Sequence, residues 1–568
     1  MKIIMKIIYI LKNNIWLSLI LLLAVIIRSY GIYFDYPFGV NYIWDETMSM
    51  VYMFDIVEKR NLFVGTYDYP ALLPWLYAPG IALKIIYIMI TNSILSIADL
   101  KQQLIISGMG QVYIIVRWYS VFYGTATIYL LYKIFSIIFK NKSSVYYGCL
   151  VYAVSFIPLY LSHWGKAHSG MVFFLMLSLY FAIKYEQTTK KKNLLWSATF
   201  AAGSISVHYI GITAVIFPVF AALTHWRELK KNFIFQLAIL YLAVTGLFYF
   251  GNFDGVRSMI IKTMSYFQST NFTGMAKVGL AERFSYIFRD IFRLEPVFFS
   301  VFVLMLIVNV KNIFKDRYLK YILAGLGANY LLMTTVIVWP QMTRWLLIFF
   351  TLSVPLGAIL LVEKLRDFHV KKYLIVAICA ILLLPSIYIS SHWLKLLDQN
   401  TENEAIVWLK DNLKTGEFAY SFDRYIDTPL SYEAMIWHRD HNGFNSKKIN
   451  YMLANKDKLA NYGINLLYDY DKYRYEDLGG EKTKYLIFSY YNKKDVSGYI
   501  SLQQIDKMKA EISRYHQFEL VAKFSPVKEK NSIPDNAVID VLNNPTSWRI
   551  LLDLKKSGQF IEIYRLIK

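Results

Sequence analysis

The stretch Phe34-Asp-Tyr-Pro-Phe-Gly-Val-Asn-Tyr-Ile-Trp-Asp-Glu-Thr-Met-Ser-Met50 follows the first long apolar run of the chain, Ile15–Ile27. It presents two adjacent carboxylates, Asp45 and Glu46, just outside the segment that is expected to cross the membrane. Neighbouring acids are usually solvated surface, but these two lie among Trp44 and other aromatic and methionine residues. A carboxylate against an apolar wall suits a general base or a holder of a polar acceptor. The stretch therefore predicts a chemical site at the outer end of the first membrane helix.

The composition of the whole chain is that of a membrane protein. Of 568 residues, 56% are hydrophobic and only 18% are charged, and apolar runs of about 20 residues recur, which is the length that crosses a bilayer. The net charge of +21 would suit a nucleic-acid partner, but most lysines and arginines lie between the apolar runs. That distribution orients a membrane protein, so we expect membrane lipid and no nucleic acid as a partner. The N-terminus resembles a signal peptide without a cleavage site, which predicts an uncleaved anchor.

The alternation of apolar runs and basic loops predicts a mainly α multi-pass bundle with about 11 transmembrane helices. Each short loop expected on the cytoplasmic side is basic, because clustered positive charge is costly to translocate. A long external loop, 251–295, carries several arginines, and 193–224 is expected to divide into two short helices near His208. The predicted crossings are 13–33, 113–139, 145–164, 169–186, the two helices of 193–224, 232–250, 296–311, 319–339, 345–362 and 373–390.

One apolar run, 71–97, is not counted as a crossing. Pro74, Pro79, Gly80 and Lys84 interrupt it. The charge pattern also requires it to return to the side where it began, so we predict a juxtamembrane or re-entrant segment packed against protein.

A second kind of sequence begins at residue 392. Charges become frequent, and the apolar runs become too short to cross a membrane. An amphipathic helix is expected over Glu402–Leu413 and another near 501–515. Strand-like runs follow the period-two pattern at 417–422, 484–490, 518–525 and 559–567. The predicted organisation is thus a transmembrane domain, 1–391, whose external loop 34–112 carries the acid pair, and an external soluble α/β domain, 392–568.

Several basic residues are expected on the external side of the bundle. Arg117 and Arg344 each stand at the external start of an apolar helix, against the usual charge bias. An anionic headgroup would explain both, since a guanidinium holds phosphate oxygens with two hydrogen bonds. His163, His168 and His208 lack the tight spacing of a metal site, so no cofactor is predicted and a divalent metal is not indicated. Lys166, Arg283 and Arg289 have the simpler interpretation of interfacial anchors.

In combination these features resemble a known family. The order of motifs is the Asp45-Glu46 pair, Tyr67-Asp68-Tyr69-Pro70-Ala71-Leu72-Leu73, Arg117 in Arg-Trp-Tyr-Ser-Val-Phe-Tyr-Gly-Thr, the Pro158–Phe174 hairpin, the Ser206-Val207-His208-Tyr209 turn and Arg344-Trp345-Leu346-Leu347. It resembles the membrane-embedded GT-C glycosyltransferases, specifically the protein O-mannosyltransferase family and its bacterial relatives, which include the lipid A aminoarabinose transferase. The resemblance covers roughly residues 10–390, and Glu404–Lys410 also resembles the bacterial members.

The resemblance implies an inverting transfer of a hexosyl or pentosyl group from a polyprenyl-phosphate carrier to an acceptor on the external face of a bacterial inner membrane. It assigns Asp45 as the base and Glu46 as a holder of acceptor or sugar. The remaining residues of the predicted substrate site are Arg117, Arg344, His168, His208, Tyr69 and Asp68.

Three departures from the family pattern concern the sugar and the acceptor. The family often has an Asp where this chain reads Ala167-His168-Ser169-Gly170, and often a Lys at the position of His208. Its Pro-Pro-Leu is Pro70-Ala71-Leu72 here, with Tyr69 where aminoarabinose transferases carry Lys.

Two alternatives are kept. One is a non-enzymatic transporter of lipid-linked saccharide, which should show paired half-repeats with helices broken at mid-membrane. The other is a glycan polymerase or ligase, which would differ only in its acceptor.

Overall fold

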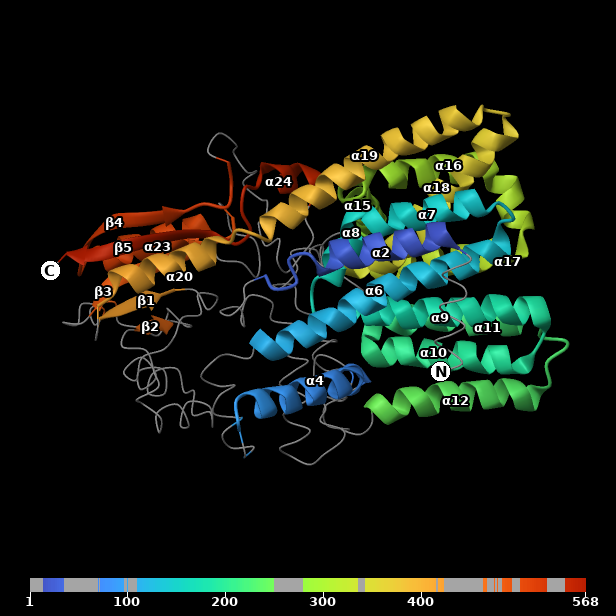
Figure 1. The fold of residues 1–568 in the computed structure, drawn as a ribbon, viewed down its shortest axis with the longest axis horizontal. Coiled ribbons are helices and arrows are strands. Elements are labelled where there is room, and N and C mark those ends of the chain that lie inside the picture. The colour runs from blue at the N-terminus through green and yellow to red at the C-terminus, as the bar shows by residue number, and fades with distance from the viewer. Residues whose placement is uncertain are drawn as a thin grey trace. The chain divides into compact units, whose positions relative to one another are not determined.

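The computed structural model describes residues 14–34, 70, 72–94, 96, 100, 110–249, 279–335, 343–414, 417–422, 463–466, 475, 478, 483–492, 501–528 and 547–567 (Figure 1). They fall into two compact units, each described by itself. One holds the described parts of Met1–Ile32, Met48–Gly80 and Ile115–Trp393, and the other those of Tyr33–Thr47, Ile81–Ile114 and Leu394–Lys568.

Helices make up the described part of the chain as far as residue 396. They are α2 (Ile15–Ser29), α4 (Leu72–Thr91), α6 (Gly110–Ile138), α7 (Lys142–Val154), α8 (Phe156–Ser162), α9 (Ala167–Thr188), α10 (Lys191–Val207), the 3₁₀ helix η1 (Tyr209–Val215), α11 (Ile216–Thr224), α12 (Lys231–Tyr249), α15 (Leu280–Leu294), α16 (Pro296–Lys315), α17 (Arg317–Thr335), η3 (Thr343–Leu346), α18 (Leu347–Asp367) and α19 (Lys372–Leu396).

The chain is a multi-pass membrane protein, as its composition predicts. Within the described residues, seven helices are long and apolar enough to cross a membrane, and the bent pair α7–α8 would make an eighth. The predicted mainly helical bundle is confirmed, whereas the count of eleven is not. Two of the predicted crossings correspond to shorter apolar helices, Ile15–Ser29 and Tyr209–Thr224.

Two segments differ from the prediction. Helix α4 runs through Pro74 and Pro79 without a break. Pro74 lies in the first turn, where a backbone N–H has no partner to lose, and Pro79 removes only one hydrogen bond from a long apolar helix. The end of the expected loop 251–295 is the helix α15. Its buried side chains, Ile287, Ile291 and Leu294, follow the spacing of one helix face.

Helix α18 is the centre of the bundle. It packs against α7, α16 and α17, and 94% of its most apolar window is buried, against 11% for the peripheral α12. A helix that is apolar all round belongs in such a position. Gly357 lets α18 approach α16 closely, because a Cβ atom there would lie 2.7 Å from the Cα atom of Phe302.

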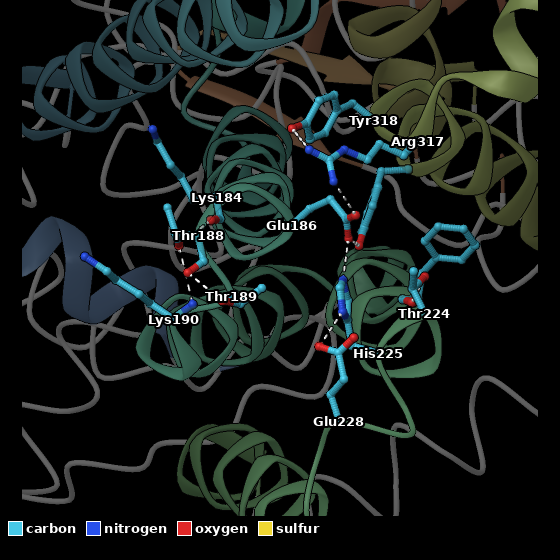
Figure 2. A network of polar contacts seen from close by, with 12 residues as sticks. Lys184, Glu186, Thr188, Thr189, Lys190, Thr224, His225, Glu228, Arg317 and Tyr318 are labelled. Atoms are coloured by element: carbon cyan, nitrogen blue, oxygen red, sulfur yellow. Dashed lines mark hydrogen bonds and ion pairs between the residues drawn. The ribbon is translucent and has the colours of Figure 1, made fainter.

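A polar network ties three elements together at the end of α9 (Figure 2). The carboxylate of Glu186 lies between Arg317 and His225. It accepts hydrogen bonds from His225 Nε2 at 2.9 Å and from the hydroxyl of Tyr321 at 3.1 Å. His225 Nδ1 lies 3.2 Å from Glu228. The carboxylate thus links α9 to the end of α11 and to the start of α17.

The C-terminal unit contains a five-stranded sheet in the order β2-β1-β3-β5-β4. Strand β1 runs parallel to β2 and β3, and β5 runs antiparallel to β3 and β4. The elements are α20 (Thr401–Asn412), β1 (Phe418–Ser421), β2 (Gly463–Leu466), β3 (Thr483–Tyr490), α23 (Leu502–Ile512), β4 (Gln517–Phe524), α24 (Trp548–Asp553) and β5 (Phe560–Ile567).

Two helices cover the two faces of this sheet. Ile487 of β3 belongs to a core shared with α20, and its neighbour Phe488 belongs to a core shared with α23. Successive side chains of a strand point to opposite faces, so the sheet lies between the helices. The predicted α/β fold, its four strands and its two main helices are confirmed. The short β2 and α24 were not predicted.

Candidate functional site

A short loop between α8 and α9, residues 163–166, and the first turn of α9 carry candidate functional side chains. His163, Trp164, Lys166 and His168 are all at most 1% exposed. Helices α7 and α8 are bent by 56° at Ser155, and the end of α8 before the loop is buried, with Ser162 1% exposed. Ionisable side chains are costly in such surroundings and mark binding or transport sites. The burial of Lys166 argues against its interpretation as an interfacial anchor and for its interpretation as a candidate site residue.

His168 and His208 form a pair. Their ring centroids are 4.9 Å apart, although one residue starts α9 and the other lies at the break between α10 and η1. His208 Nδ1 accepts a hydrogen bond from the backbone N–H of Ile210 at 3.3 Å, which fixes its ring. Neither ring nitrogen of His168 has a hydrogen-bond partner among the described residues. The pair thus offers two buried nitrogens to a ligand.

Arg344 joins this pair from η3, directly before α18. It is 8% exposed, and it acts electrostatically on His168, as Lys166 and His208 do. Trp345, the next residue, lies 6.3 Å from the ring of His208. Within the described part of the chain, the groups that act electrostatically on His168 are all basic. We call His168, His208, Lys166 and Arg344 the basic cluster.

Arg117 reaches the other end of the same loop. Its guanidinium lies 5.5 Å from the ring centroid of Trp164, and its Nη1 donates a 2.9 Å hydrogen bond to the carbonyl oxygen of Ile32. Helix α6 begins at Gly110, so Arg117 is two turns inside the helix and not at its start. The loop thus separates the two predicted phosphate ligands, with Arg117 at Trp164 and Arg344 at His168.

The four other predicted site residues, Asp45, Glu46, Asp68 and Tyr69, lie outside the described residues. A metal centre is not evident in the part that is described, where no three His, Cys, Asp or Glu residues gather to hold an ion. Cys149 and Cys379 are free and buried.

Two buried charged residues were missed by the reasoning from sequence. Arg28 and Glu295 are both fully buried in the helical unit. Arg28 looked like the end of an apolar run, and Glu295 like part of an external loop. Neither has a local sequence signal that separates it from a surface residue.

A match to a known protein family lies in the middle of the helical unit. Residues 100–249 match the model of the dolichyl-phosphate-mannose-protein mannosyltransferase family. That stretch contains Arg117, Lys166, His168 and His208. The resemblance to this family is thereby confirmed for this part of the chain. None of the curated proteins matches the chain.

Solved structures with a similar course of the chain include three membrane glycosyltransferases. ArnT from Cupriavidus metallidurans bound to undecaprenyl phosphate is 8% identical, with 97% of this chain and 98% of that chain covered and a TM-score of 0.48. The Archaeoglobus fulgidus oligosaccharyltransferase with Zn and sulfate is 11% identical, with 97% and 88% covered and a TM-score of 0.46. The S. cerevisiae protein O-mannosyltransferase Pmt1-Pmt2 complex bound to the sugar donor is 17% identical, with 44% and 34% covered and a TM-score of 0.30. At these scores the likenesses carry no inference about activity.

Proposed function

From the family pattern in residues 100–249, we propose that this chain is an inverting glycosyltransferase of the membrane. It would move a sugar from a polyprenyl-phosphate carrier to an acceptor on the external face, which would also place the C-terminal unit outside the cytoplasm. One observation carries the proposal. The stretch that matches the family model contains three members of the buried basic cluster, and the fourth, Arg344, acts electrostatically on one of them, His168. A lipid phosphate is an anion that enters from the membrane, and such a site suits it.

The leaving group explains why the site needs positive charge. When the bond between the sugar C1 and the phosphate oxygen breaks, the electron pair stays with the phosphate. Arg344 and Lys166 would stabilise that growing charge in surroundings from which water is excluded. Arg117 would hold Trp164 and, through it, the far end of the loop.

The acceptor supplies the new bond. Its hydroxyl oxygen attacks C1 from the side opposite the phosphate, which inverts the anomeric centre, and its proton passes to Asp45. Glu46 would hold the acceptor or the sugar hydroxyls, and Asp68 and Tyr69 would line the donor's sugar. These four roles rest on the sequence pattern alone.

The test is transfer by the purified protein in lipid nanodiscs. Polyprenyl-phosphate mannose and polyprenyl-phosphate pentoses are offered with a membrane extract as the source of acceptor, and release of polyprenyl phosphate is followed by chromatography. Release that requires the extract supports the proposal. Movement of an intact lipid-linked saccharide between leaflets of a vesicle, with no donor cleaved, would instead identify a transporter.

The acceptor also separates the enzyme classes. A labelled product that is a lengthened glycan would identify a polymerase or ligase. A labelled protein or single lipid would identify a mannosyltransferase-like or aminoarabinose-transferase-like activity.

A further inference from the structure

The bend between α7 and α8 leaves backbone carbonyl groups that no helix satisfies, and side chains of other helices satisfy two of them. The carbonyl oxygen of Ala153 accepts a 2.9 Å hydrogen bond from Arg28 Nη1 of α2. The carbonyl oxygen of Val154 accepts one of 2.7 Å from the hydroxyl of Ser390 on α19. An unsatisfied backbone group is costly in an apolar bundle, so these contacts stabilise the bend.

Arg28 does more than satisfy one carbonyl. Its Nε donates to the hydroxyl oxygen of Ser162, the last residue of α8, at 3.3 Å. One guanidinium therefore bridges the carbonyl of Ala153 in the last turn of α7 and the hydroxyl of Ser162 at the end of α8. The carbonyls at the end of α7 form the negative pole of that helix, which a cation stabilises.

The surroundings are shaped for this contact. Gly124 of α6 faces it, and a Cβ atom at this position would lie 2.3 Å from Ser162 Oγ and 3.2 Å from Arg28 Nε. The Ser162 hydroxyl donates in turn to the carbonyl oxygen of Pro158 at 2.6 Å. Arg28 itself is 0% exposed, and a cation is not buried at random in a membrane protein.

The loop of the candidate site starts directly after Ser162. His163, the next residue, interacts electrostatically with Arg28. Ser169, on the far side of the loop, donates a 3.0 Å hydrogen bond to the carbonyl oxygen of Leu161. Both ends of the loop are therefore tied to the last turn of α8, one through the chain at Ser162 and the other through the hydrogen bond of Ser169. We propose that Arg28 is a positioning residue, which holds α8 so that Trp164 meets Arg117 and His168 meets His208.

The first test measures position without any substrate. Hydrogen–deuterium exchange is compared across peptides of the protein in nanodiscs. Arg28→Met removes both hydrogen bonds and the charge, and we expect exchange over 156–168 to rise about tenfold or more. Arg28→Lys keeps the charge but cannot reach both acceptors, so its rise should be smaller. Exchange over the α9–α10 hairpin beyond residue 168 should stay unchanged.

A milder variant keeps the test decisive if Arg28→Met fails to fold. Ser162→Ala removes one hydroxyl at the same bridge and should raise exchange over 156–168 by a smaller factor. Its matched control is Ser178→Ala, which removes a buried hydroxyl that donates at 2.9 Å to the carbonyl of Ser197. The control should leave 156–168 unchanged. Unchanged exchange over 156–168 in the Arg28 and Ser162 variants would overturn the proposal, and so would a rise of equal size throughout the bundle.

The second test rests on the proposed function. For a polyprenyl-phosphate sugar donor, we expect Arg28→Met to raise the donor KM about tenfold or more, with Arg28→Lys between it and wild type. A lower kcat at unchanged KM would contradict a role in placing the phosphate site. If the wild-type protein cleaves no such donor, the proposed function fails, while the exchange measurement still decides the role of Arg28.

Discussion

Neutralising Glu186 tests the network that joins α9, α11 and α17 (Figure 2). Glu186→Gln keeps the size and one acceptor oxygen, which serves the hydroxyl of Tyr321. It removes the charge that holds His225 at 2.9 Å, a charge-assisted hydrogen bond worth about 1.5–3 kcal/mol. Arg317 lies 3.6 Å from the carboxylate, but its side chain is 60% exposed, so its share is screened to below about 1 kcal/mol. We expect the variant to lose about 2 kcal/mol of unfolding free energy.

The loss should depend on pH. Burial lowers the pKa of His225, but the hydrogen bonds and charges of Glu186 and Glu228 outweigh it, so the pKa lies above its ordinary 6.5. A folded-state pKa above the unfolded one means stabilisation that is complete below about pH 6.5 and fades as the pH rises through the folded value. The difference between wild type and Glu186→Gln should therefore be largest in mild acid and shrink in base.

The assay is chemical unfolding in detergent micelles at about pH 5.5 and about pH 9, followed by tryptophan fluorescence, on either side of the titration. Glu228→Gln is the control: it touches the same ring, but its side chain is 66% exposed, so its loss should stay below about 1 kcal/mol. An equal loss at both pH values would show that His225 is uncharged in the folded protein. No loss at either pH would show that the network does not hold the helices together.

Three further predictions concern packing and chemistry. Gly357→Ala should cost about 1–3 kcal/mol of unfolding free energy, because its new carbon meets the backbone of α16, which cannot rotate away. Gly327→Ala, with open space around it, should be neutral or stabilising in the same assay. Equal changes in unfolding free energy for the two variants would contradict the close approach of α18 and α16 at Gly357. Asp45→Asn should slow transfer from a polyprenyl-phosphate donor about 10²–10⁴-fold while donor binding survives, and wild-type turnover would remove Asp45 from the mechanism. Arg344→Lys should raise the donor KM about tenfold or more, since an ammonium lacks the planar fork; an unchanged KM in kinetics at saturating acceptor would leave Arg344 as a structural residue.

Local patterns in the sequence were sufficient to predict the fold class, a helical membrane bundle followed by an α/β domain. The length of the apolar runs predicted membrane helices, and the polar interruption at His208 predicted the division of 193–224, which the structure places between Val207 and Tyr209. The period-two runs predicted four of the five strands. These patterns are read from neighbouring residues, and each reflects a physical constraint that acts along the chain itself. The helix α15 was not predicted because its sequence is rich in arginine and its apolar face consists of only three buried side chains, Ile287, Ile291 and Leu294.

The candidate site depended on tertiary structure. Nothing within ten residues of His168 indicates that His208 would lie 4.9 Å away, or that Arg344 would act on His168. The same holds for Arg28, whose partners Ala153 and Ser162 come from helices that are distant in sequence. Sequence shows which residues are costly to bury, because that cost belongs to the side chain. Only packing shows which of them are buried, since the bend at Ser155, the space left by Gly124 and the charge of Arg28 become compatible only when α2, α6 and the bent pair α7–α8 meet.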